Sequence, residues 1–106
     1  MERIIPHVVK FTCDPVFYVV NSCRGKVLSI LVSCNNTQVF EPLSNKNTSL
    51  ALSDGVILLN CIKELKNKQP TLICEFTTFE GAEAAAAKTS KVDYDFVDFT
   101  CLQVPV

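Results

Sequence analysis

Runs of β-branched and aromatic residues alternate with short polar stretches along most of this chain. Residues 26–34 begin with a lysine and continue almost entirely with apolar residues, which predicts a mostly buried strand. The turn-forming pair Asn35 and Asn36 closes it. Residues 11–20 have a similar composition, but Pro15 interrupts them and reduces their first half to an edge strand or an irregular arm.

The middle of the chain carries a hairpin signal. Residues 49–52 and 56–62 are two apolar runs, and Ser-Asp-Gly separates them. An Asp-Gly pair between two apolar runs is typical of a β-hairpin, so the sequence predicts two paired strands here. Residues 63–68 follow as one or two helical turns, which Pro70 ends.

The last third of the chain predicts two strands with a helix between them. Residues 71–79 and 94–104 are rich in β-forming residues. Residues 81–88 have the highest helix propensity in the chain, because four consecutive alanines lie between a glutamate and a lysine. This run also resembles a helical spacer or a flattened surface, so it carries no functional signal.

Length and composition indicate one globular domain. The chain has 106 residues, 48% of them hydrophobic and 20% charged, which suits a single compact core. No apolar stretch reaches the roughly 18 residues of a membrane span, and the first residues do not resemble a secretion signal. We therefore expect a nuclear or cytoplasmic, intracellular protein that contacts no membrane.

Catalytic and metal-binding chemistry is sparse. The six cysteines lie mostly in apolar runs with no C-x-x-C spacing, so we expect reduced core thiols. His7 is the only histidine, next to Pro6 in the predicted arm, and offers a poor base or ligand. The sequence therefore predicts no enzyme activity, no catalytic residue, no metal and no cofactor.

The order of these elements is that of an OB-fold. We expect a mainly β domain, a five-stranded Greek-key barrel with a short helix between the third and fourth strands. Residues 50–55, Leu-Ala-Leu-Ser-Asp-Gly, resemble a turn that recurs in OB domains of the replication protein A family. The single domain 1–106 would then comprise an N-terminal arm or edge strand, 1–25, and an OB-like barrel, 26–104.

The resemblance implies a protein-docking subunit of a replication, repair or telomere complex, with a larger protein subunit as its partner and single-stranded DNA bound through that complex. The net charge of −1 argues against tight autonomous DNA binding. The candidate partner-binding residues are Phe17, Tyr18, Lys68 and Tyr94.

Two alternatives remain open. One is a small β-rich accessory or inhibitory protein, for example a viral one, that binds a host protein through an exposed strand at residues 11–20. The lesser alternative is direct binding of single-stranded DNA, in which basic side chains contact phosphates. The candidate nucleic-acid-binding residues are Arg24, Lys26, Lys46, Lys63 and Lys66.

Overall fold

A mixed α/β domain is seen in the computed structural model, which describes residues 4–43, 50–51, 55–67, 72–89 and 95–99. Its elements, in chain order, are β1 (Ile5–Phe11), β2 (Phe17–Cys23), β3 (Lys26–Cys34), β4 (Thr37–Pro42), β5 (Leu50–Ala51), α1 (Gly55–Lys66), β6 (Leu72–Ile73), α2 (Phe79–Thr89) and β7 (Asp95–Phe99). Neither helix in this part of the chain is long and apolar enough to span a membrane.

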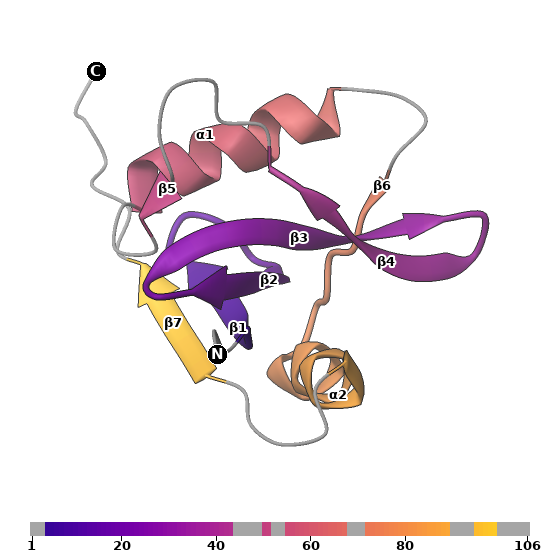
Figure 1. The fold of residues 1–106 in the computed structure, drawn as a ribbon. Helices are drawn as coiled ribbons and strands as arrows, with labels where there is room; N and C mark the ends of the chain where they lie inside the picture. Colours follow the sequence, from indigo (N-terminus) through magenta and orange to yellow (C-terminus); the bar gives the residue numbers. More distant parts are fainter. Residues whose placement is uncertain (1–3, 44–49, 52–54, 68–71, 90–94, 100–106) are drawn as a thin grey trace.

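The sheet is open and has the strand order β4-β3-β2-β1-β7 (Figure 1). Strands β1 to β4 pair as antiparallel neighbours, and β7 returns to pair in parallel with β1. The short strands β5 and β6 both pair with β3, near its start and near its end respectively. Strand β3 therefore pairs with four other strands, β2, β4, β5 and β6.

Tight turns join β2 to β3 and β3 to β4. Arg24 and Gly25 form the first turn with φ of 55° and 75°, and Asn35 and Asn36 form the second with φ of 52° and 63°. Two consecutive left-handed residues match the twist of the flanking strands, and asparagine and glycine tolerate this conformation best. The strand predicted over 26–34 and the turn that follows it are confirmed.

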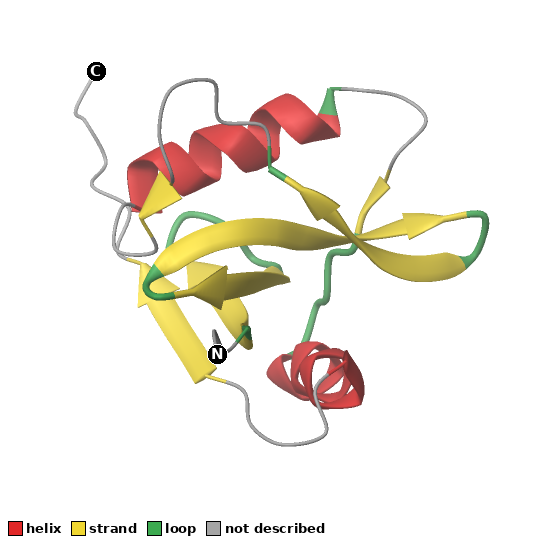
Figure 2. Cartoon of the chain, viewed as in Figure 1, coloured by secondary structure: helices red, strands yellow, loops and turns green. Residues whose placement is uncertain are grey.

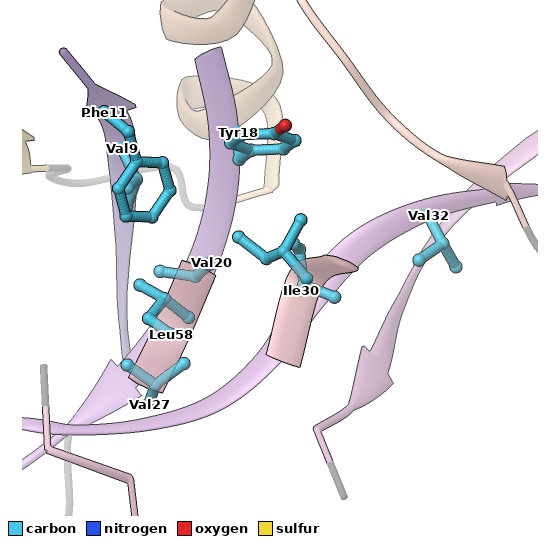
Figure 3. Close-up of a cluster of buried hydrophobic side chains, with 9 residues drawn as sticks. Val9, Phe11, Tyr18, Val20, Val27, Ile30, Val32 and Leu58 are labelled. Carbon is cyan, nitrogen blue, oxygen red and sulfur yellow. The ribbon is translucent and has the colours of Figure 1, made fainter. Parts of the chain in front are cut away.

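The two helices cover opposite faces of the sheet (Figure 2). Side chains alternate between the faces along each strand, so that Val9 packs in the α1 cluster and Val8 in the α2 cluster. Figure 3 shows the α1 cluster from close by. Its buried members are Val9, Phe11, Tyr18, Val20, Val27, Ile30, Val32, Leu58 and Ile62.

A β-bulge changes this alternation in β3. Val27 and Ile30 belong to the same cluster although an odd number of positions separates them. The β2–β3 register shifts between Asn21 and Ser22, so that Leu28 is the extra residue on β3. A bulge of this kind lets both apolar side chains reach the α1 face.

The predicted OB barrel is wrong, because the sheet stays open and both helices follow β4. The predicted strand over 56–62 is the first part of helix α1. Leu58, Ile62 and Leu65 recur at helical spacing and pack on the sheet. A short apolar run fits a buried strand and a helix equally well by periodicity, which explains the error.

The predicted N-terminal arm over 1–25 is also wrong, since β1 and β2 lie in the middle of the sheet. Pro15 lies between two strands instead of inside one, and Asp14 supports that turn by accepting a hydrogen bond from the Val16 N–H at 3.2 Å. Of the strand predicted over 71–79, the described residues 72–78 contain only the two-residue β6 and an isolated bridge at Phe76, and Phe79 begins helix α2. Of the strand predicted over 94–104, residues 95–99 form β7, and the others lie outside the described residues.

Helix α2 confirms the predicted helix and gives its alanines a role. Ala82, Ala85 and Ala86 recur at helical spacing and are buried in the α2 cluster, whereas Ala84 and Ala87 are exposed. Small side chains let the helix axis approach the sheet closely. The side of α2 that faces the sheet is therefore a packing surface, and the spacer interpretation does not explain this burial.

Candidate functional site

The predicted nucleic-acid-binding residues do not gather in one groove. Arg24 and Lys26 lie exposed at the β2–β3 turn, beside β5, which precedes helix α1. Lys63 and Lys66 lie in the last turn of α1, which leads to β6. The two groups are therefore at opposite ends of the helix (Figure 1). Lys46 lies outside the described residues.

The predicted partner-binding residues are likewise divided. Phe17 and Tyr18 are adjacent in β2 and belong to clusters on opposite faces of the sheet. Phe17 is half-buried and packs edge-to-face on Phe79, with ring centroids 6.0 Å apart. Tyr18 is fully buried and cannot meet a partner. Lys68 and Tyr94 lie outside the described residues.

Tyr18 instead centres a polar network that connects three segments. Its hydroxyl donates a hydrogen bond to Asp14 Oδ2 at 2.6 Å and accepts one from Lys66 Nζ at 2.7 Å. Lys66 Nζ also forms an ion pair with Glu75 Oε2 at 2.5 Å. The network attaches the end of α1 to β2 and to the segment after β6.

The protonation states of this network follow from burial and from its hydrogen bonds. Burial, together with the hydrogen bond to Asp14, raises the pKa of Tyr18 to about 12, although Lys66 opposes this shift. For Lys66, burial lowers the pKa, but the hydrogen bonds to Glu75 and Tyr18 outweigh it and the net shift is upward. Lys66 is thus a charged structural residue, which makes it a poor candidate for a phosphate contact.

A buried histidine and serine lie side by side in β1 and β2. His7 Nδ1 lies 3.2 Å from Ser22 Oγ and 3.1 Å from the carbonyl oxygen of Ile5. A serine hydroxyl next to a histidine ring nitrogen is the arrangement in which the histidine activates the serine as a nucleophile. The two side chains are only 5% and 3% exposed, so no substrate reaches them and we assign the pair to strand packing. The expectation of His7 in an arm is wrong.

The expectation of reduced core thiols is met only in part. Cys23, Cys34, Cys61 and Cys74 form no disulfide, although Cys34 is exposed and lies outside the core, whereas Cys13 in the β1–β2 turn is disulfide-bonded and Cys101 lies outside the described residues. Burial raises the pKa of the Cys61 and Cys74 thiols, which lowers their thiolate content. Among the residues that the structure describes, no cluster of three or more histidine, cysteine, aspartate or glutamate side chains could hold a metal ion.

Strand β4 offers a different kind of site, because it is the last strand in the sheet order and, among the described residues, pairs with β3 alone. Its first three residues, Thr37, Gln38 and Val39, are exposed. The Val39 side chain is 43% exposed, so β4 presents an apolar group to solvent. The β3–β4 hairpin projects from the body of the molecule (Figure 1), so its outer edge is accessible.

The register shows which backbone groups of β4 face outward. The carbonyl of Leu31 accepts a hydrogen bond from the Cys74 N–H at 3.1 Å, so it points away from β4. Leu31 pairs with Phe40, and this pair is therefore of the non-hydrogen-bonded kind. Because such pairs alternate, the N–H and C=O groups of Phe40 and Gln38 point to the open side of the strand.

The sequence prediction missed this edge. Residues 37–40 received no strand assignment, although the polar and apolar residues after Asn36 alternate weakly. A tight Asn-Asn turn after a firm strand was the available signal for a second hairpin strand. Comparison of the chain with protein-family models, with curated proteins and with solved structures found no match.

Proposed function

We propose that this domain is a protein-docking module that binds an extended protein segment along the open edge of β4. The observation that carries the proposal is the one-sided pairing of β4, which leaves the backbone groups of Gln38 and Phe40 directed outward. An added strand satisfies such groups with ladder hydrogen bonds, and its side chains then set specificity.

The composition of β4 supports this use. Protected edge strands carry lysines, bulges or inward-pointing charges that prevent pairing. Strand β4 has none of these in its first four residues, and its six-residue register with β3 is regular. Glu41 and Pro42 limit pairing only at the far end of the strand.

This proposal keeps the expected protein-docking role and moves its site. Residues 11–20 cannot serve as an exposed docking strand, because β1 and β2 each have neighbours on both sides. Membership of a nucleic-acid maintenance complex depended on the barrel resemblance, and the open sheet gives it no support. The separation of the basic residues likewise gives no support to direct binding of single-stranded DNA.

Selection from a library of displayed linear peptides tests the docking role. We expect selected peptides to bind the wild-type chain and the Gln38→Ala variant equally, because alanine keeps the outward N–H. The Gln38→Pro variant removes that N–H without removing a hydrogen bond to β3, and it should lose binding. Peptides that bind all three proteins equally, in samples with the same circular dichroism spectrum, would place docking elsewhere.

A further inference from the structure

The open edge of β4 is complementary to itself. We infer that a second copy of this chain occupies it, with the two β4 strands antiparallel and Val39 opposite Val39 of the second copy. The inference rests on the proposed docking role and names its occupant. Such a contact joins the two sheets into one continuous sheet about a two-fold axis.

The backbone satisfies this register. With Val39 on the axis, Gln38 lies opposite Phe40 of the second copy, and Phe40 lies opposite its Gln38. These are the residues whose N–H and C=O groups point outward, so each pair exchanges hydrogen bonds in both directions. The valines form the intervening non-hydrogen-bonded pair, in which side chains approach most closely.

The side chains of β4 are also compatible with this register. Val39 loses its 43% exposure against an identical apolar side chain. Glu41, the one charged residue of β4, lies opposite Thr37 of the second copy, so no like charges face each other. The register thus combines apolar contact at the centre with polar residues at the rim.

The two symmetric registers with the axis one residue away pair the two β4 strands less favourably. An axis at Phe40 places Pro42, which has no N–H, opposite Gln38, so the Gln38 carbonyl accepts no hydrogen bond, and it places Val39 opposite the charged Glu41. An axis at Gln38 places Phe40 opposite Asn36, which belongs to the turn with φ of 63° and not to the strand. Of these three registers, only the axis at Val39 pairs each outward residue with a strand residue that has an N–H and places two apolar side chains opposite each other on the axis.

Sedimentation velocity at increasing concentrations of the chain tests the inference. The contact is small, so we expect a weak, concentration-dependent dimer of the wild-type chain. Gln38→Pro removes an outward N–H from each strand and should weaken dimerisation by about tenfold or more, whereas Gln38→Ala should dimerise like the wild type. A wild-type chain that stays monomeric when concentrated overturns the inference.

Charge complementation gives a second test that does not depend on proline. Val39→Lys and Val39→Glu chains should each be monomeric, because like charges would face each other across the axis. Mixing the two variants should restore dimers in which the opposite charges meet. Dimers formed by either variant alone, or no dimers in the mixture of two folded variants, would show that Val39 is not on the axis.

The two proposals fail in different ways. If the wild-type chain is monomeric but selected peptides bind β4 and lose affinity with Gln38→Pro, the docking role stands and the second copy is not its occupant. If dimers form and Gln38→Pro leaves them unchanged, another surface carries the dimer. If neither peptides nor a second copy depends on the Gln38 N–H, both proposals are wrong.

Discussion

Replacing Ala86 with leucine tests whether the alanines of α2 are a packing surface. Ala86 is fully buried in the α2 cluster with Val8, Val19 and Leu31, which are also fully buried. A leucine at this position adds a branched group where no free surface remains. The helix must move away from the sheet or the side chains must leave their preferred rotamers.

The loss in free energy of unfolding caused by Ala86→Leu follows from the burial of Ala86. Overpacking a close-packed core costs about 1–3 kcal/mol, and helix propensity changes little between alanine and leucine. The same substitution at Ala84, an exposed residue of the same helix, should stay within about 0.5 kcal/mol of the wild type. We therefore expect Ala86→Leu to be about 2 kcal/mol less stable than Ala84→Leu.

Urea and thermal denaturation of the two variants measure this difference. For a domain of this size, a difference of about 2 kcal/mol corresponds to a Tm lower by about 8 °C. Equal stability of Ala84→Leu and Ala86→Leu would refute the packing argument. It would favour instead a helix that lies free of the sheet, as the spacer interpretation of the alanine run requires.

Three further predictions follow from the core, the polar network and the charges. In a Tyr94→Phe background, the tyrosinate absorbance should titrate near pH 12, because the pKa of Tyr18 is raised to about 12. The raised pKa stabilises the fold below about pH 10, and this contribution is lost as the pH rises to 12. In urea denaturation, the Tyr18→Phe variant should therefore lose less stability than the wild type between pH 10 and pH 12. Ile62→Ala, a fully buried site, should cost about 2–5 kcal/mol in urea denaturation, whereas Val56→Ala, at a site 64% exposed, should cost less than about 0.5 kcal/mol. A labelled single-stranded oligonucleotide should show no saturable, salt-sensitive anisotropy change with the isolated chain, and such a change would restore the DNA-binding alternative.

Local chemistry was enough to predict several elements. Residues 26–34 form β3, Asn35 and Asn36 form its turn, and residues 81–88 lie within α2. In each case the signal depends on neighbours in sequence, such as the tolerance of asparagine for positive φ or the helix propensity of alanine. The apolar character of residues 11–20 also indicated β2, but β1 lies mostly in the segment expected to be an arm, and Pro15 marks the turn between the two strands.

The candidate site could not be predicted in the same way. Tyr18 and Lys66 are far apart in the chain and meet only because α1 crosses the face of β2. Their types suggested a partner-binding aromatic and a phosphate-binding lysine, but Tyr18 is buried and the Lys66 ammonium group is already bound by Tyr18 and Glu75. Val39 had no signal as a site residue, because exposure of an apolar strand residue depends on which strand ends the sheet.

The sequence by itself determined strand β3 with its Asn35-Asn36 turn, the helix of the alanine run, which segments are apolar, and a net charge of −1. Only the tertiary structure decided that residues 56–62 are helical, that β1 lies inside the sheet, and that β4 lies at its edge. The physical reason is that turns depend on local backbone preferences. Strand order and the choice between helix and strand for a short apolar run depend on which distant surfaces bury each other.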